Sequence, residues 1–388
     1  MIYLDNAATT PLLEEVLDEM LPYLKENYGN PSSIHKLGRQ ANNALELARK
    51  RIARLINSQC NVVFTSGATE ANNLALKGLA HAMRGKGNHI ITSSVEHEAV
   101  LEPCRELERE GFKITYLPVD RQCMVDLDAL EHSIDERTIL VSIMFANNEV
   151  GTIQPIKDVA RIAHKHGVPF HTDAVQAVGK IPVDVKDLGI DLITLSAHKM
   201  YGPKGVGALC INSDLKIEPI LHGGGQEDEI RSGTQNVAGI VGMGKAAEVA
   251  LQKINVYSGQ VNNLRDLLIG NVLNDTTHSK LNGHPTQRLP NNAHFTFLGV
   301  NGEDLIIKLD ENGIAASTGS ACSIQKQKAS HVLKAMGFNH EEITGSLRLT
   351  LGIQNTSHEI ERTVNILSEI VRELRNVSPY GLKYAAQK

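Results

Sequence analysis

Residues 192–205 read LITLSAHKMYGPKG, a short apolar run followed by a turn that carries a lysine. The apolar run predicts a buried strand ending at Ser196, and the glycines and proline that follow predict a tight turn. Lys199 would then lie at the carboxyl end of a buried strand, where open α/β sheets bind ligands. A lysine desolvated at such a place has a free amine for Schiff-base chemistry. Most lysines are solvated surface residues, so this turn alone does not establish a site.

Apolar runs along the preceding chain predict the rest of a sheet. They span residues 62–65, 89–93, 114–119, 139–145, 169–172 and 206–211, in addition to 192–196. Helical periodicity lies between several of them, at 71–83 and 156–166. Strands that alternate with helices predict an α/β fold with a mainly parallel seven-stranded sheet covered on both faces.

The last third of the chain has a different pattern. Residues 251–273 form a long helical pattern, residues 294–297, 314–317 and 347–351 predict strands of a smaller sheet, and 359–374 predict a closing amphipathic helix. The chain has 388 residues, more than the roughly 250–300 at which a single core stops growing. We therefore expect a large domain at 16–255 and a smaller α/β domain built from 1–15 and 256–388.

Composition excludes several classes of function. The net charge is -5 and there is no long basic run, so nothing indicates a nucleic-acid groove. No run approaches the roughly 18 apolar residues that span a bilayer, and the N-terminus does not resemble an export signal. The five cysteines are scattered without a C-x-x-C motif, which argues against a disulfide framework or a structural zinc site. We expect a cytoplasmic protein with reduced thiols.

Two more segments carry residues suited to one aromatic, phosphorylated cofactor. Asp173 ends an apolar strand, where its carboxylate can pair with the protonated pyridine nitrogen of pyridoxal phosphate, although a helix N-cap is an equally good interpretation. The segment around Ala68 and Thr69 reads as strand, glycine turn and helix, and backbone N–H groups at such a junction bind phosphate. An ordinary capped helix start has the same pattern.

Four further residues are candidates for contacts with cofactor or substrate. His97 could stack on a cofactor ring, although a lone histidine is more often a structural hydrogen-bonding group. Asn148 follows an apolar strand and suits either ligand contact or a turn. Arg348 lies in an apolar stretch and needs a partner, either a substrate carboxylate or an internal ion pair. Cys322 stands among small residues before the polar run 323–328, which predicts an exposed and reactive thiol.

The order and completeness of these motifs identify the chain as similar to cysteine desulfurases of the NifS/IscS type, in the class V aminotransferase family of fold type I. The matching segments are 3–11, 29–33, 66–73, 96–97, 147–149, 173–176, 196–199, 223–226, 231–234, 320–322 and Arg348.

The resemblance implies a role for each matching residue. Lys199 would bind pyridoxal phosphate as a Schiff base and move the substrate Cα proton. Asp173 would pair with the pyridine nitrogen, Gln176 would contact the ring phenolate, and His97 would stack on the ring and act as acid or base. The phosphate would be bound by Ala68, Thr69, Ser196 and His198, and by Thr234 from the neighbouring subunit of a homodimer. Asn148 and Arg348 would hold L-cysteine.

The reaction implied by the resemblance converts L-cysteine to L-alanine and leaves a persulfide on Cys322. The expected sulfur acceptor is an IscU-type iron–sulfur scaffold protein, in which case Cys322 could transiently ligate iron. The segment 323–330 has the length typical of the IscS-like group, but residues 325–328 are unusually basic and residue 329 is not the expected proline. Selenocysteine lyase is the nearest alternative, followed by another class V aminotransferase, which would give Cys322 no role, and by a catalytically silent scaffold.

Overall fold

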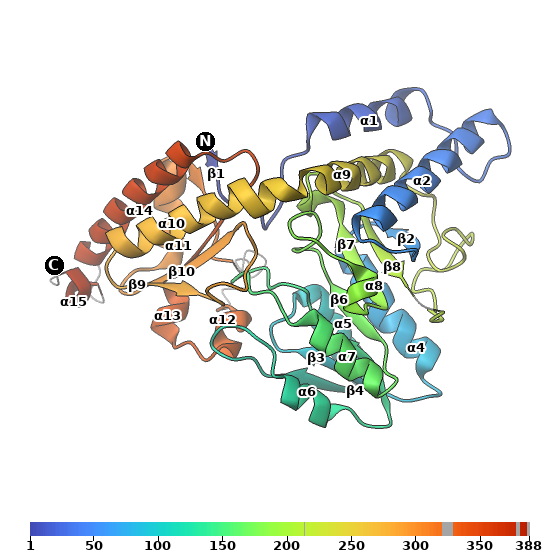
Figure 1. The fold of residues 1–388 in the computed structure, drawn as a ribbon, viewed down its shortest axis with the longest axis horizontal. Helices are drawn as coiled ribbons and strands as arrows, with labels where there is room; N and C mark the ends of the chain where they lie inside the picture. Colours follow the sequence, from blue (N-terminus) through green and yellow to red (C-terminus); the bar gives the residue numbers. More distant parts are fainter. Residues whose placement is uncertain (213, 320–328, 378–380, 386–388) are drawn as a thin grey trace.

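All seven predicted strands form one sheet in a computed structural model, which describes residues 1–212, 214–319, 329–377 and 381–385 (Figure 1). The strands are β2 (Asn61–Thr65), β3 (His89–Ser93), β4 (Lys113–Leu117), β5 (Thr138–Ser142), β6 (Phe170–Asp173), β7 (Leu192–Ser196) and β8 (Gly207–Ile211). Their order is β2-β8-β7-β6-β5-β3-β4. β8 runs antiparallel to both of its neighbours, and the other pairs are parallel. The predicted α/β fold with a mainly parallel sheet is confirmed.

Helices cover both faces of this sheet, because alternate strand residues point to opposite sides. One face packs against α1 (Glu14–Lys25), α2 (Lys36–Leu55), α6 (Leu127–Ser133), α7 (Ile156–Lys165), α8 (Val185–Leu188) and α9 (Val237–Val256). The other face packs against α5 (Glu98–Arg109) and a run made of α3 (Ala68–Asn73), the π-helical turn η1 (Leu74–Gly78) and α4 (Leu79–Met83). On β2, Val62 and Phe64 join the first core and Val63 joins the second.

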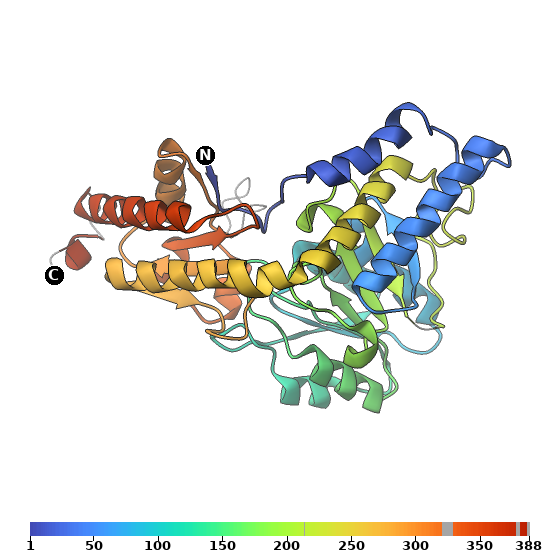
Figure 2. The same ribbon diagram turned by 45° about the horizontal axis from the view of Figure 1, so that its top comes forward.

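A long helical run connects the sheet to a second lobe of the molecule (Figures 1 and 2). It consists of α9, the π-helical turn η3 (Tyr257–Val261) and α10 (Asn262–Asp275). The helix predicted at 251–273 lies within this run, which begins earlier than the sequence pattern indicated. The predicted division of the chain at residues 15 and 255 stays a prediction.

The second lobe has its own hydrophobic core around a small antiparallel sheet. Its strands are β9 (Ser279–Asn282), β10 (Asn292–Phe297) and β12 (Ser346–Thr350), in the order β12-β10-β9. The remaining helices of the described chain are α11 (Gly302–Glu311), α12 (His331–Ala335), α13 (His340–Thr344), α14 (Ser357–Val377) and α15 (Leu382–Ala385). None of the helices in the described ranges is both long and apolar enough for a membrane span.

One predicted strand pairs differently from our expectation. The run at 314–317 does not join the three-stranded sheet: β11 (Ile314–Ala315) instead pairs in parallel with the N-terminal strand β1 (Ile2–Tyr3). Ile2 and Leu4 are buried in the core of the second lobe, which holds the N-terminal segment beside β11. Ser317 keeps one antiparallel bridge, to Arg348 on β12.

The contact between α2 and α9 depends on a small residue. A Cβ atom at Gly244 would lie 2.7 Å from both Cα and Cβ of Ala48. We therefore expect Gly244→Val to force the helices apart and lower the free energy of unfolding by about 1–3 kcal/mol, measured by denaturant unfolding. Gly270→Val is the matched control, because nothing lies within 4 Å of a Cβ there. Equal stability of the two variants would contradict the assigned packing.

Candidate active site

A cavity of about 550 Å³ opens at the carboxyl ends of β6 and β7. Parallel strands bring their carboxyl ends to one edge of the sheet, so the turns that follow them converge there. Nine of the predicted site residues line this cavity: Ala68, Thr69, His97, Asn148, Asp173, Gln176, Ser196, His198 and Lys199. Residues separated by more than a hundred positions in sequence thus form one site.

Lys199 ends the short 3-10 helix η2 (Ala197–Lys199), which directly follows β7. Its Nζ atom donates hydrogen bonds to the backbone carbonyls of Ala7 at 2.6 Å and Ala8 at 2.8 Å. The amine is therefore held at the cavity between the strand end and the N-terminal segment. Lys199 is not an ordinary surface lysine.

The carboxylate of Asp173 is positioned by two donors. Asp173 is 7 % exposed at the end of β6. Its Oδ2 accepts a hydrogen bond from Asn72 Nδ2 at 2.7 Å, and its Oδ1 accepts one from the backbone N–H of Val175 at 3.1 Å. Asn72 is itself fully buried on α3, and its uncharged amide holds the carboxylate in place. A fixed, charged carboxylate is what a protonated pyridine nitrogen requires.

His97 lies at the N-cap of α5, where its Nδ1 accepts a hydrogen bond from the backbone N–H of Ala99 at 3.0 Å. Burial lowers the pKa of His97, and the charge of Lys199 lowers it further, while Asp173 opposes both effects. A neutral ring with Nδ1 as acceptor carries its proton on Nε2. His97 can therefore present an N–H donor and a flat apolar face to a ligand in the cavity.

The turn Gly67–Thr69, which also lines the cavity, has the features of a phosphate site. Gly67 begins the turn before α3, and a Cβ atom on Gly207 would lie 2.5 Å from the carbonyl carbon of Gly67, so only glycine at 207 allows this close approach. The N–H groups of Ala68 and Thr69 open the helix and have no partner within it.

Two residues at the end of β7 and in the turn after it also line the cavity. Ser196 ends β7, and the Nδ1 atom of His198 lies 3.2 Å from Oγ1 of Thr9. Burial and the charges of neighbouring lysines lower the pKa of His198 to about 4. His198 is therefore a neutral hydrogen-bonding group near pH 7.

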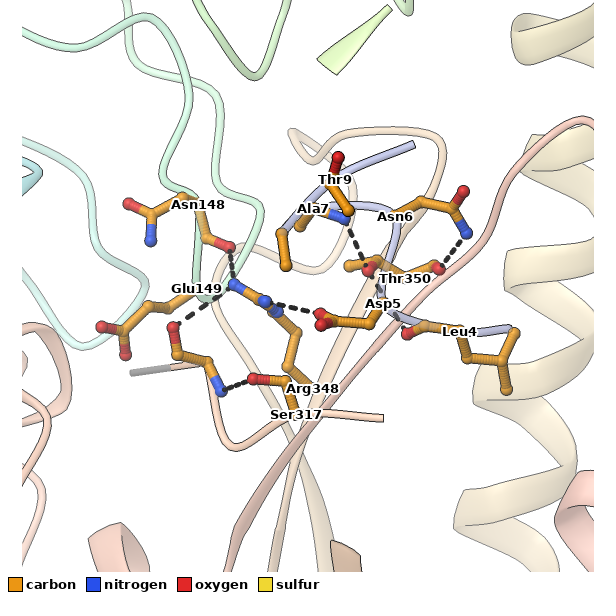
Figure 3. Close-up of polar contacts among 12 residues, drawn as sticks. Leu4, Asp5, Asn6, Ala7, Thr9, Asn148, Glu149, Ser317, Arg348 and Thr350 are labelled. Atoms are coloured by element: carbon orange, nitrogen blue, oxygen red, sulfur yellow. Dashed lines mark hydrogen bonds and ion pairs between the residues drawn. The ribbon is translucent and has the colours of Figure 1, made fainter. Parts of the chain in front are cut away.

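Arg348 on β12 is bound to protein groups and does not line the cavity (Figure 3). Its guanidinium pairs with Asp5 at 2.8 Å and donates to the carbonyls of Asn148 at 2.9 Å and Gly319 at 3.3 Å. Its Nε atom is buried without a hydrogen-bond partner. The predicted internal ion pair is present, and Arg348 contacts the backbone of Asn148, which lines the cavity.

The last two predicted site residues lie elsewhere. Thr234 is exposed and does not line the cavity of its own chain. Cys322 lies outside the described residues. Beyond it, Ser330 donates a hydrogen bond to the buried carboxylate of Glu149 at 2.6 Å. His331 contacts the carbonyl of Glu96 at 2.9 Å, next to His97.

Sequence reasoning missed several residues that shape the site. Asn72 follows Thr69 by three positions, so helical spacing could have placed both on the side of the cavity. Ala7 and Ala8 belong to a matching motif that has no role assigned from the sequence, because they act through backbone oxygens. Lys180 is buried and contacts Gln176. Its sequence context does not distinguish it from a surface lysine, and a surface position is the usual one for lysine.

These residues fit pyridoxal phosphate. The cavity offers an amine, a fixed carboxylate, a neutral imidazole and a helix start at one place. Lys199 would hold the cofactor covalently, Asp173 would bind the pyridine nitrogen, and the Ala68–Thr69 turn with Ser196 and His198 would hold the phosphate. No group of three or more acidic, histidine or cysteine side chains in the described ranges is arranged to hold a metal ion.

The model of the aminotransferase class-V family matches residues 2–363. The chain belongs to this family. A cysteine desulfurase IscS from Methanosarcina thermophila is 54% identical over 380 residues, 97% of this chain and 94% of the relative. A solved NifS-like protein superimposes with a TM-score of 0.90 at 40% identity, covering 96% of this chain and 100% of the other. Another, described as SspA in complex with cysteine, has a TM-score of 0.80 at 37% identity, covering 92% and 100%.

The resemblance predicted from the motifs, to cysteine desulfurases of the NifS/IscS type, is thereby confirmed, and so is fold type I. Pyridoxal phosphate is the cofactor of this family, in agreement with the chemistry of the cavity. The individual site residues stay predictions.

The role of Asn72 can be tested with two neighbouring asparagines. Asn72→Asp would place a second carboxylate beside Asp173, and two close carboxylates do not both stay ionised. We expect this variant to lose most of its bound cofactor, measured by absorbance near ~420 nm after gel filtration. Asn73→Asp is the control, because the Asn73 side chain donates its hydrogen bond to the backbone carbonyl of Thr69 and not to Asp173. Full cofactor retention in Asn72→Asp would contradict the assigned contact.

Proposed function

We propose that this chain is a cysteine desulfurase that transfers the sulfur of L-cysteine to its own Cys322 and releases L-alanine. The observation that carries the proposal is the convergence of nine predicted residues on one cavity in a chain 54% identical to a cysteine desulfurase. The solved relative in complex with cysteine supports the choice of substrate.

Each residue has a distinct task in this proposal. Bound pyridoxal phosphate supplies an aldehyde that captures amines and a ring that accepts electrons. Asp173, held by Asn72, keeps a positive charge on the ring nitrogen. Lys199 removes and returns the proton at the substrate Cα, and its position between β7 and the N-terminal segment keeps the amine within the cavity. His97 stacks on the ring and supplies an N–H group on Nε2.

Sulfur transfer then requires a second nucleophile. The Cys322 thiolate attacks the substrate sulfur, a new S–S bond forms, and the bond between the substrate Cβ and sulfur breaks with its electron pair left on carbon. A proton delivered to that carbon completes alanine. One cysteine and one thiol thus give one alanine and one persulfide, without an external oxidant. Thiolates, rather than thiols, carry out such displacements.

The proposal extends to the oligomeric state of the protein and to the protein that accepts its sulfur. Thr234 is exposed on its own chain, which leaves it available to the phosphate of the neighbouring subunit in a homodimer. An IscU-type iron–sulfur scaffold in the cytoplasm is the proposed acceptor, and Cys322 is the proposed transient iron ligand during that transfer. The basic run at 325–328 would favour an acidic surface on the acceptor.

Removal of the thiol tests the mechanism directly. Cys322→Ser should lower the rate of alanine release from cysteine by at least about a hundredfold, because a hydroxyl does not displace sulfur. Cofactor absorbance should stay unchanged, since Cys322 has no proposed role in binding it. Cys60→Ser is the control and should keep wild-type activity. Undiminished sulfur delivery by Cys322→Ser would exclude the mechanism.

Arg348 has both a structural partner and a proposed substrate role, and two variants separate them. Arg348→Lys loses the bidentate geometry for a carboxylate, so we expect the KM for cysteine to rise about tenfold or more. Asp5→Asn breaks the same ion pair but keeps the guanidinium, and we expect a much smaller change in KM. Steady-state kinetics of alanine formation provide the comparison. Equal effects would assign Arg348 a purely structural role.

A further inference from the structure

A second lysine, Lys180, does not line the cavity but contacts Gln176, one of the predicted cofactor ligands that does. Lys180 is 1% exposed and ranks among the largest fully buried side chains of the described chain. Gly179 precedes it with a φ of +81°, and a Cβ atom there would lie 3.0 Å from the Cβ of Met200. The left-handed conformation and the close packing both favour glycine at this position. The turn that buries Lys180 therefore depends on Gly179.

Among the described residues, the side-chain hydrogen bonds of Lys180 go to Gln176. Its Nζ donates to the backbone carbonyl of Gln176 at 3.0 Å and lies 3.5 Å from the side-chain Oε1 of Gln176. Burial, and secondly the positive charge of Lys199, lower the pKa of Lys180 to about 7. Burial of an amine costs free energy, so a buried lysine at this position indicates a function beyond packing.

The geometry of Gln176 suggests that function. A glutamine amide has an acceptor end and a donor end, and its surroundings decide which end faces which way. The ammonium of Lys180 has donors only, so it attracts Oε1. The Nε2 end then points away from Lys180, and it donates to the carbonyl of Ala7 at 3.0 Å, the oxygen that also receives Lys199.

We propose that Lys180 is a positioning residue that orients the amide of Gln176, so that its N–H donor faces the ring oxygen of bound pyridoxal phosphate. This inference rests on the proposed function and extends it. With the amide reversed, Oε1 would face the anionic ring oxygen and repel it. Lys180 also places a cation behind this end of the ring, and an anionic ligand in the cavity raises the pKa of Lys180 and keeps it charged.

Other groups around this end of the cavity carry or exchange protons. They are Asp173 on β6, His97 at the start of α5, His198 and Lys199 in η2, and Lys204. The pKa of His198 is lowered in part by Lys180, so the charge of Lys180 is felt across the site. Removing that charge makes protonation near the bound cofactor easier.

The test follows the visible absorbance of the cofactor-loaded protein as a function of pH. In Lys180→Met we expect the pH midpoint of the band near ~420 nm to move upward by about half a unit or more, and the cofactor to dissociate faster on dialysis. Lys186→Met is the matched control, because Lys186 is exposed six residues further on. Lys180→Gln, which is also uncharged, is measured in the same way should the methionine variant fail to fold.

A double-mutant cycle distinguishes positioning from a general electrostatic or structural effect. In a Gln176→Ala background, Lys180→Met should produce a clearly smaller shift than in the wild-type background, because only the direct effect of the lost charge remains. A full additional shift in that background would overturn the proposal, as would an unchanged midpoint in Lys180→Met. A wild-type protein without any cofactor band would instead contradict the proposed function itself, so the two failures are distinguishable.

Discussion

The amine of Lys199 is held between two backbone carbonyls of the N-terminal segment, and the rest of the site depends on this contact. Ala7 and Ala8 are brought there because β1 pairs with β11 and because Ile2 and Leu4 are buried in the second lobe. The lysine itself comes from the end of β7 in the seven-stranded sheet. The amine of Lys199 therefore lies where the two parts of the molecule meet.

The same N-terminal segment reaches the proposed substrate side of the site. Asp5 pairs with Arg348, and Arg348 donates to the carbonyl of Asn148, which lines the cavity. Thr350 on β12 accepts from the N–H of Ala7 (Figure 3). A few residues near the N-terminus thus couple the strand that carries Arg348 to the turn that carries Lys199.

Much of the fold and site could be predicted because short sequence patterns correspond directly to the strands and to the turns that follow them. Apolar runs bounded by turns marked all seven strands of the large sheet, and strand ends marked Asp173 and Lys199. The pairing of β11 with β1 was not predictable, because two-residue strands leave no periodicity. Asn72 and Lys180 were missed for a different reason. Their importance lies in the burial and hydrogen-bond direction of single side chains, which depend on tertiary structure.

The central claim is that sulfur passes from cysteine, bound at the Lys199 cavity, to Cys322. Incubation of the protein with sulfur-labelled L-cysteine, followed by mass analysis of its peptides under non-reducing conditions, tests this claim most directly. The account predicts one labelled sulfur atom on the peptide that contains Cys322, formed together with alanine and lost on reduction. Alanine formation without label on that peptide, or label on another cysteine alone, would contradict it.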